Sequence, residues 1–273
     1  MLPACLITSL RYLKAASFLL ALAWLTACSG TPDSATEASR PAATKILRVG
    51  MSPDYPPMAY QEDGVIKGME VELAGVVAAQ MGMAEDIVPM PWSELIPALL
   101  RGDVDVIMSG MTVTEERAEL VAFSDSYMTL GQMAIIRIRD AGRFRTPMQA
   151  LESGARVGFV NDTTGQAFVD GTAVIRVKQG YATAEQGLDA LNKGQIDIFI
   201  HDAPTSWDLA VSPWADTLIS MYRPLTEESL AWAVRKDDKA LLKGLNEALA
   251  GLKASGRLES MQYRWIPVQV YLK

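Results

Sequence analysis

From residue 46 onward, short apolar runs alternate with segments whose apolar residues recur at the spacing of an amphipathic helix. The apolar runs predict strands at Ile46–Met51, Asp86–Met90, Val104–Met108, Met128–Ile138, Arg156–Val160, Ile196–Ile200, Leu218–Met221 and Leu230–Arg235. Helices are expected at Gly68–Gln80, Ser93–Leu100 and Ala182–Lys193, after Thr114, Thr146 and Gly165, and from Asp238 to Trp265 with a break near Gly256. Strands that alternate with helices predict an α/β fold built on parallel, doubly wound sheets.

Several residues mark the expected ends of these helices. Ser93 and Thr114 are suitable N-cap residues, and Pro147 occupies the favoured first position of a helix. Gly102 and Gly194 are expected to end helices, because glycine readily adopts the left-handed conformation found there.

A weak internal repeat indicates that the chain folds as two lobes of one architecture. The segment Leu100–Gly110 aligns with Leu191–Asp202 when Gly102 is placed on Gly194 and Asp105 on Asp197. In the same order along the chain, Arg48-Val49-Gly50 matches Arg156-Val157-Gly158. Each match is short, but two matches in the same order favour two similar lobes.

The N-terminal region has the pattern of an export signal. Basic Arg11 and Lys14 precede an apolar run over 15–25, and Leu25-Thr26-Ala27-Cys28 follows. We therefore expect a signal peptide over 1–27. The Leu-Thr-Ala-Cys sequence resembles the bacterial lipobox, in which the cysteine becomes the lipidated first residue, so residues 28–44 would form a lipidated tether. An uncleaved anchor helix is the alternative, and both interpretations export the protein to the periplasm or cell surface.

Composition excludes several classes of function. The 273 residues contain 49% hydrophobic and 21% charged residues, as expected for a globular chain. A formal net charge of −7 argues against a nucleic-acid partner. One histidine and two cysteines exclude the usual four-ligand zinc site, and neither a phosphate-binding loop nor a Gly-x-Ser-x-Gly motif occurs. We expect neither a metal nor a cofactor.

Four polar turns follow the predicted strands, at 52–58, 109–117, 161–165 and 201–204. Ligands of open α/β sheets bind beyond the carboxyl ends of the strands. If two lobes face each other there, Arg117 with Thr112 and backbone N–H groups would lie opposite Asp202, Thr163 and Thr164.

A fixed cation opposite a fixed carboxylate matches an α-amino acid zwitterion. Arg117 would bind the α-carboxylate in a two-pronged contact, and Asp202 would bind the α-ammonium group. Tyr55 and Trp92 would supply apolar walls. The structural alternatives are a solvated Arg117, an Asp202 that only caps a helix, and Tyr55 and Trp92 as ordinary core residues.

These residues resemble the solute-binding proteins of polar amino acid ABC transporters, the family 3 extracellular binding proteins. The similarity spans about Lys45 to Trp265. It rests on Tyr55-Pro56-Pro57, Gly68-Met69-Glu70-Val71-Glu72-Leu73, Leu95-Ile96-Pro97-Ala98-Leu99, Gly102-Asp103-Val104-Asp105, Ser109–Arg117 and Phe123-Ser124-Asp125-Ser126-Tyr127.

The resemblance implies a type II periplasmic binding protein-like fold with two lobes and two hinge strands. Lobe 1 would comprise 45–136 and 230–273 and lobe 2 would comprise 137–229, with hinges near 136–139 and 226–230. The resemblance assigns the α-carboxylate to Arg117, helped by Gly110, Thr112 and Thr164, the ammonium to Asp202, and the ligand side chain to Tyr55 and Trp92. The expected ligand-binding residues are Tyr55, Trp92, Ser109, Gly110, Thr112, Arg117, Thr164, His201 and Asp202.

Departures from the family pattern bear on the identity of the ligand. His201-Asp202-Ala203-Pro204 looks like the turn of glutamine-binding members, but Ser52 stands where members reading a polar or basic ligand often have aspartate. Val160 stands where glutamine binders have lysine, and Met58 replaces the usual aromatic residue. These features favour a neutral or polar amino acid over a basic one.

The sequence leaves three functions open. The first is a monomeric binding protein that delivers a free amino acid to an ABC permease, anchored to the membrane through lipid on Cys28. The second is an enzyme resembling cyclohexadienyl dehydratase, with His201 or Glu62 as its acid. The third is a ligand-sensing module that acts through a separate partner.

Overall fold

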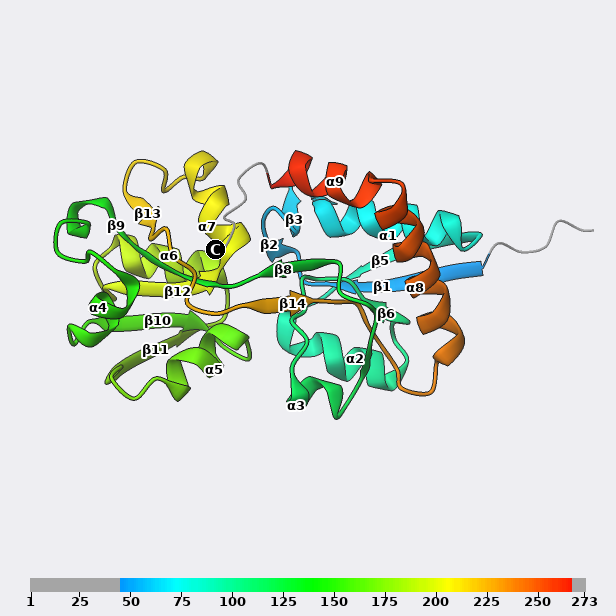
Figure 1. Ribbon diagram of the computed structural model, residues 1–273, viewed down its shortest axis with the longest axis horizontal. Coiled ribbons are helices and arrows are strands. Elements are labelled where there is room, and N and C mark those ends of the chain that lie inside the picture. Colours follow the sequence, from blue (N-terminus) through cyan, green and yellow to red (C-terminus); the bar gives the residue numbers. More distant parts are fainter. Residues whose placement is uncertain (1–44, 267–273) are drawn as a thin grey trace, which may run out of the picture. The chain divides into compact units, whose positions relative to one another are not determined.

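The computed structural model describes residues 45–266, which form two lobes of mixed α/β structure (Figure 1). The predicted signal peptide, the tether with its lipidated Cys28, and the last seven residues of the predicted lobe 1 lie outside the described residues. Between residues 45 and 266, no helix is long and apolar enough to cross a membrane.

Lobe 1 contains a five-stranded sheet in the order β5-β1-β6-β15-β7. Its strands are β1 (Lys45–Met51), β5 (Met83–Pro89), β6 (Val106–Ile107), β7 (Ala122–Phe123) and β15 (Ala233–Val234). The strands β5, β1 and β6 are parallel, whereas β15 runs antiparallel to both of its neighbours.

Lobe 2 repeats this plan with the order β11-β10-β12-β9-β13. Its strands are β9 (Gln132–Arg137), β10 (Arg156–Val160), β11 (Val177–Tyr181), β12 (Ile198–Asp202) and β13 (Leu218–Ser220). Again three strands are parallel, and β9 is antiparallel to its neighbours. Each sheet therefore has the predicted parallel strands, together with one strand that runs antiparallel to them. In each lobe the antiparallel strand is the one that the chain enters from the other lobe.

Two short strands, β8 (Met128–Leu130) and β14 (Glu228–Leu230), pair antiparallel where the chain passes between the lobes (Figure 1). The single strand predicted over Met128–Ile138 is divided at Gly131, where an added Cβ would lie 1.9 Å from the Thr226 carbonyl oxygen. The first hinge predicted near 136–139, and with it the lobe boundary at 136, was wrong. Residues 132–137 form β9 inside the lobe 2 sheet, because they pair with β12 and β13.

A small three-stranded sheet follows β1 in lobe 1. It consists of β2 (Asp54–Tyr55), β3 (Ala59–Glu62) and β4 (Val65–Lys67). The turn between β3 and β4 is Asp63-Gly64, and both residues have positive φ. Asp-Gly between paired strands is a strong hairpin signal, but the strands predicted from the sequence do not include β3 or β4.

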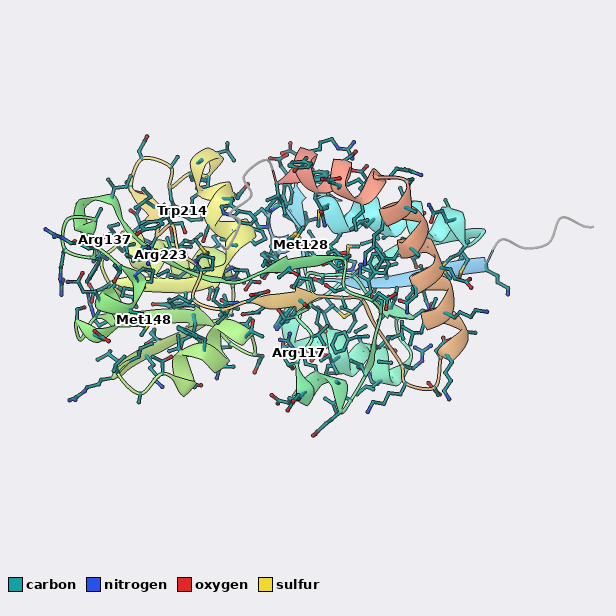
Figure 2. The ribbon with its side chains drawn as sticks, in the orientation of Figure 1. Arg117, Met128, Arg137, Met148, Trp214 and Arg223 are labelled. Atoms are coloured by element: carbon teal, nitrogen blue, oxygen red, sulfur yellow. The ribbon has the colours of Figure 1, made fainter. Side chains whose placement is uncertain are left out.

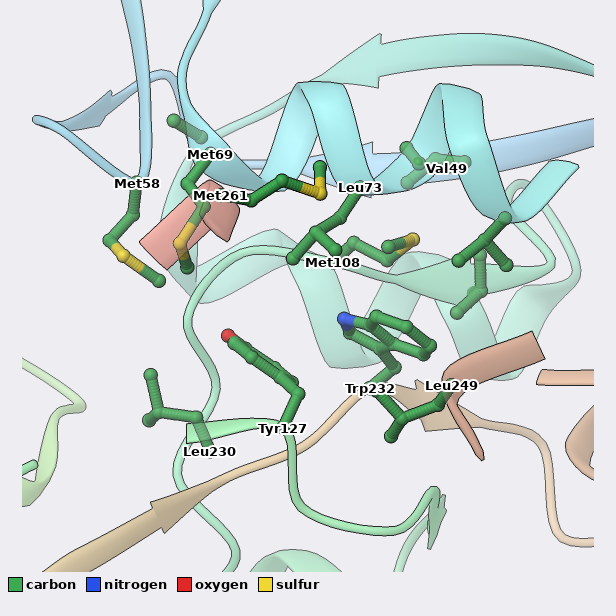
Figure 3. Close-up of a cluster of buried hydrophobic side chains, with 14 of the residues drawn as sticks. Val49, Met58, Met69, Leu73, Met108, Tyr127, Leu230, Trp232, Leu249 and Met261 are labelled. Atoms are coloured by element: carbon green, nitrogen blue, oxygen red, sulfur yellow. The ribbon is translucent and has the colours of Figure 1, made fainter. Parts of the chain in front are cut away.

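Helices cover both faces of each sheet, and apolar clusters fill the space between. Lobe 1 contains α1 (Met69–Gln80), η1 (Trp92–Glu94), α2 (Leu95–Arg101), α3 (Glu115–Ala118), α8 (Lys239–Ala254) and α9 (Arg257–Trp265). Lobe 2 contains η2 (Ile138–Asp140), α4 (Pro147–Glu152), α5 (Thr164–Gly171), α6 (Ala184–Asn192), α7 (Ala203–Asp208) and η3 (Leu209–Val211). In the largest cluster, Tyr127 stacks on the buried Trp232 at 5.6 Å between ring centroids, beneath Leu73 and Met108 (Figure 3).

Most predicted helix ends are confirmed. Thr114 accepts a hydrogen bond from the Arg117 N–H, and Thr146 accepts one from Gln149. Gly102 and Gly194 adopt positive φ after α2 and α6. Ser93 was a wrong prediction, because it lies within η1 and the residue before α2 is Glu94.

The two repeat motifs form the same ionic contact in each lobe. Asp105 Oδ2 accepts from the backbone N–H and Nε of Arg48, each at 3.0 Å. Asp197 Oδ2 accepts from the same groups of Arg156, at 3.0 and 2.9 Å. Arg48 also donates to the carbonyl of Gly102 after α2, and Arg156 to that of Gly194 after α6, each at 2.7 Å. The aligned residues thus join two parallel strands at their amino ends.

A second arginine completes each of these clusters. Arg137 at the end of β9 donates to the carbonyls of Leu191 and Ile196 and to Asp197, and it is buried. Arg235 after β15 likewise donates to the carbonyls of Leu99 and Val104 and lies 3.6 Å from Asp105. These carbonyls occupy equivalent positions in the repeat. We call each group of one aspartate and two arginines a clamp.

Replacing the clamp residue Asp197 with asparagine is expected to lower the free energy of unfolding by about 2 kcal/mol at neutral pH. Hydrogen bonds from Arg156, with those from Arg137, hold the pKa of Asp197 well below its usual range. The unfolded chain therefore binds this proton more readily, and the clamp's contribution is present above pH ~4 and lost as pH falls below it. Urea unfolding should show that the difference in free energy of unfolding between wild type and Asp197→Asn decreases at acid pH. A difference that stays constant with pH would contradict the prediction.

Candidate functional site

A cleft between the carboxyl ends of the two sheets contains the predicted ligand-binding residues. The space between its walls, open solvent included, is about 490 Å³. All nine predicted residues line it: Tyr55, Trp92, Ser109, Gly110, Thr112, Arg117, Thr164, His201 and Asp202. Five more residues line it as well: Ser52, Asp54, Val160, Thr163 and Ala184.

Arg117 lies in the short helix α3 and projects toward lobe 2 (Figure 2). Its guanidinium donates to the Thr112 carbonyl at 3.0 Å and to the Asp162 carbonyl of lobe 2 at 3.2 Å. It also lies 5.2 Å from the centroid of the Trp92 ring. Burial lowers the pKa of Arg117, but a guanidinium remains charged in proteins. In residues 45–266 no carboxylate forms an ion pair with it.

The backbone near Thr112 also faces Arg117. Thr112 bridges Leu230, and its neighbours Met111 and Val113 bond with the strand at 229–231. Because peptide groups alternate in direction along an extended segment, the N–H and C=O of Thr112 point away from that strand. They point toward the side on which Arg117 bonds the Thr112 carbonyl. A carboxylate placed there would meet a guanidinium and a backbone N–H together.

Asp202 stands at the end of β12, across the cleft from Arg117. Its carboxylate accepts from the Tyr55 hydroxyl at 2.7 Å and from the side-chain amide of Gln132. Although Asp202 occupies the N-cap position of α7, its side chain makes no capping bond. Burial raises the pKa of Asp202, and the charge of Glu228 adds to this shift. A cation bound here would relieve the cost of ionising Asp202.

Tyr55 and Trp92 each have polar partners in addition to their apolar contacts. Burial and the charge of Asp202 raise the pKa of Tyr55 well above 10, so its hydroxyl stays protonated and donates to Asp202. The Tyr55 ring packs on Gly110, where an added Cβ would lie 2.6 Å from a ring carbon and where φ is +67°. Trp92 donates from its indole N–H to the Asp162 carbonyl at 2.9 Å. Both aromatic residues therefore link lobe 1 to lobe 2.

His201 stacks on Phe199 and meets the edge of Tyr55, each at 5.6 Å between ring centroids. Its Nδ1 is buried without a hydrogen-bond partner among the described residues. Burial lowers the pKa of His201, which keeps the ring neutral near pH 7. A neutral imidazole offers one nitrogen as an acceptor to whatever occupies the cleft.

Glu228 on β14 is a cleft-side residue that the sequence did not suggest. Its carboxylate accepts from the hydroxyls of Thr112 in lobe 1, Thr164 in lobe 2, and Thr226 beside it, at 2.7–2.9 Å. Each threonine hydroxyl carries one proton, so Thr112 and Thr164 use theirs on Glu228. Their hydroxyls are therefore not free to donate to a ligand carboxylate in this arrangement, which leaves the backbone N–H groups for that role.

A buried carboxylate supports the loop that carries Gly110. Glu70 is fully buried and accepts from the Gly110 N–H at 2.9 Å, from the Trp232 indole at 3.2 Å and from the Tyr127 hydroxyl. Burial raises the pKa of Glu70, while these three hydrogen bonds oppose the rise. Glu70 belongs to the Gly68–Leu73 motif, but nothing in the sequence indicated that it reaches this loop.

No group of three or more histidine, cysteine or acidic residues within 45–266 is arranged to hold a metal ion. Glu62, a proposed acid, lies on β3 and pairs with Lys67, and it is not among the residues lining the cleft. His201, the other proposed acid, does line the cleft.

Known proteins resemble this chain over most of its length. The probable histidine-binding protein of Neisseria gonorrhoeae is 28% identical over 264 residues, covering 93% of this chain and 95% of that protein. Holo ArgBP from T. maritima superposes with a TM-score of 0.71 at 34% identity, covering 81% of this chain and 95% of that one. The ancestral amino acid-binding protein AncCDT-1, described as a precursor of cyclohexadienyl dehydratase, gives a TM-score of 0.73 at 28% identity, covering 81% and 95%.

The model of the bacterial extracellular solute-binding proteins, family 3, matches residues 47–268. Further curated relatives are named as amino acid-binding proteins of ABC transporters. The matched range contains nearly all of both sheets, the strands β8 and β14 between the lobes, and every residue that lines the cleft. The chain therefore belongs to family 3 of the bacterial extracellular solute-binding proteins.

Proposed function

We propose that the protein captures a free α-amino acid between its two lobes and delivers it to an ABC permease. The observation that carries this proposal is the pair of opposite charges on opposite sides of one cleft, Arg117 from lobe 1 and Asp202 from lobe 2. Arg117 and the Thr112 N–H would bind the α-carboxylate, and Asp202 would bind the ammonium group. The names of relatives include histidine, cystine, arginine and glutamine binders, so they do not select one ligand.

The pairing of charges also explains how a ligand would favour the closed lobes. Arg117 already reaches the Asp162 carbonyl of lobe 2, and Tyr55 reaches Asp202, so both contacts form only when the lobes approach. A zwitterion adds attraction to both lobes in the closed state alone. A ligand shifts such an equilibrium by its differential affinity for the two states.

A thermal-shift screen of the twenty amino acids on the purified protein tests this function. An amino acid present at 100 times its Kd should stabilise the protein by about 2.7 kcal/mol, which raises the melting temperature measurably. Absence of any shift with all twenty would contradict the proposal.

Asp202→Asn should weaken the affinity for that amino acid by about 10–100-fold at neutral pH, because a charge-assisted hydrogen bond to the ammonium is lost. In the wild type, binding requires ionised Asp202, whose pKa is raised. Affinity should therefore be constant above that pKa and fall as pH drops through it, whereas Asp202→Asn should show no such fall. Calorimetric titration across pH checks both points. An equal decline in wild type and variant would assign the pH effect to another group.

We infer that the protein acts by binding rather than by catalysis. The elimination that cyclohexadienyl dehydratases perform needs an acid near the leaving group. Neutral His201 is poorly suited to this role, and Glu62 is paired with Lys67 on an exposed strand. Incubation with arogenate or prephenate should yield no aromatic product, and accumulation of such a product would overturn this inference.

We also propose that the protein is exported and acts as a monomer held to the membrane by lipid on Cys28. The basic and apolar N-terminal pattern ending in Leu-Thr-Ala-Cys supports this proposal. Mass spectrometry of the N-terminal peptide from membranes would test it, since an unmodified Cys28 would contradict lipidation.

A further inference from the structure

The charges that line the cleft do not balance once an α-amino acid backbone is assigned. Among the described lining residues, Arg117 is the only lysine or arginine, whereas Asp54 and Asp202 are both acidic. The α-carboxylate would neutralise Arg117, and the α-ammonium would neutralise Asp202. Asp54 then remains without a counter-ion in a closed cleft. Because Asp54 is half-buried, a cationic group that contacts it in the closed cleft would form an ion pair partly shielded from water, so a ligand that supplies a second positive charge is favoured.

Asp54 is held in place rather than free to turn away. It lies on β2, it is half-buried, and its carboxylate accepts a hydrogen bond from the Ser52 hydroxyl at 2.7 Å. Ser52 is itself buried, and its N–H donates to the Ser109 hydroxyl at 2.9 Å, which fixes its position. No ion pair involves Asp54 within residues 45–266. The Ser52 hydroxyl therefore directs a charged and otherwise unpaired carboxylate at the cleft.

Asp54 is placed to contact the side chain of a ligand bound in this cleft. It lines the cleft together with Arg117 and Asp202. It also lines a second hollow, which shares Ser52 and Trp92 with the cleft. A ligand whose backbone lies between Arg117 and Asp202 would extend its side chain along walls that include Asp54.

A second acceptor lies in the same cleft. Nδ1 of His201 is buried and has no partner among the described residues, and the charge of Asp54 acts on this imidazole. Asp54 is an acceptor when ionised, and the neutral ring of His201 offers one acceptor nitrogen. A ligand side chain with several N–H donors could bond to Asp54 and to the acceptor nitrogen of His201 together.

We propose that the ligand is an α-amino acid with a long cationic side chain, a guanidinium or an ammonium, and that Asp54 is the residue that selects it. This inference rests on the proposed function and reverses the expectation of a neutral or polar ligand. That expectation came from Ser52, which occupies the position where an aspartate was sought. The structure places a carboxylate in the cleft two residues later, with Ser52 as its hydrogen-bond donor.

Arginine and citrulline provide a test, because they have similar length and shape and differ in the charge of the side-chain end. Calorimetric titration of the wild type should show arginine or lysine binding at least 100-fold more tightly than citrulline or glutamine. Asp54→Asn should weaken binding of the cationic ligand by about 10–100-fold and leave citrulline within about threefold. Asp63→Asn is the matched control, since it removes one charge from the same small sheet at an exposed position outside the cleft.

The outcomes separate this inference from the function on which it rests. If none of the amino acids binds, the proposed function fails. If citrulline or glutamine binds as tightly as arginine, and Asp54→Asn leaves their ratio unchanged, the function stands and the role of Asp54 is overturned. If Asp63→Asn reproduces the effect of Asp54→Asn, the preference arises from overall charge and not from this carboxylate.

Discussion

Arg117→Ala is expected to lower the affinity for the amino acid by at least 100-fold, about 3 kcal/mol or more. The variant removes the only cationic side chain among the described residues that line the cleft, and with it the contact to the Asp162 carbonyl across the lobes. The α-carboxylate would then meet Glu228 nearby with no opposing charge between them. Calorimetry gives the loss of affinity directly. Arg117→Lys should recover only part of it, since lysine keeps the charge but not the planar fork.

The fold of the Arg117→Ala variant should be intact, because the contacts of this side chain, to the Thr112 and Asp162 carbonyls and the Trp92 ring, all lie at the cleft. Its melting temperature without ligand should stay close to that of the wild type. Arg101→Ala is a suitable control, since Arg101 is exposed at the end of α2 and pairs only with Glu94 and Asp103. Wild-type affinity in Arg117→Ala would remove the basis for the proposed ligand-binding mode.

Glu70→Ala is expected to cost the fold about 3–6 kcal/mol, a large share of the 5–15 kcal/mol that stabilises a typical domain. It leaves the Gly110 N–H, the Tyr127 hydroxyl and the Trp232 indole without their acceptor inside the core (Figure 3). Urea unfolding would measure the loss. Because Gly110 lines the cleft, affinity for the amino acid should fall as well.

Two further variants keep this prediction testable if Glu70→Ala does not fold. Glu70→Gln retains one acceptor oxygen and should cost less than the alanine variant. Because the pKa of Glu70 is raised, wild-type stability should decline as pH rises through it, and Glu70→Gln should lack this decline. Glu72→Ala is the matched control: Glu72 accepts from Arg264 and the Trp265 indole at the surface, and its loss should cost about 1 kcal/mol or less. If Glu70→Ala and Glu72→Ala lowered the free energy of unfolding equally, the predicted importance of the buried hydrogen bonds to Glu70 would be contradicted.

The repeat in the sequence predicted more of the fold than any single motif did. Aligning Asp105 with Asp197 and Arg48 with Arg156 identified pairs that form the same contact in each lobe. The apolar pattern could not show where the strand over 128–138 divides. That division depends on the close approach of the Thr226 carbonyl to Gly131, which is distant in sequence.

Some residues of the candidate site could likewise be predicted from the sequence, and others could not. Arg117 and Asp202 could be found from the sequence because each follows a strongly apolar strand, where ligand turns are expected. Glu228 could not be found, because two of its partners, Thr112 and Thr164, come from separate segments and meet it only where the lobes join. Asp54 lay within a turn that was identified, but its orientation depends on the Ser52 hydroxyl.

The clamps have a consequence for how such a protein can change. Asp105 and Asp197 immediately precede β6 and β12, whereas Gly110 and Asp202 lie at or beyond the opposite ends of those strands. The residues that hold each sheet together are therefore separated by a strand's length from the residues that face the ligand. Substitutions at the cleft leave the clamps untouched, so new ligand preferences can evolve, or be engineered, on a scaffold whose stability is set elsewhere.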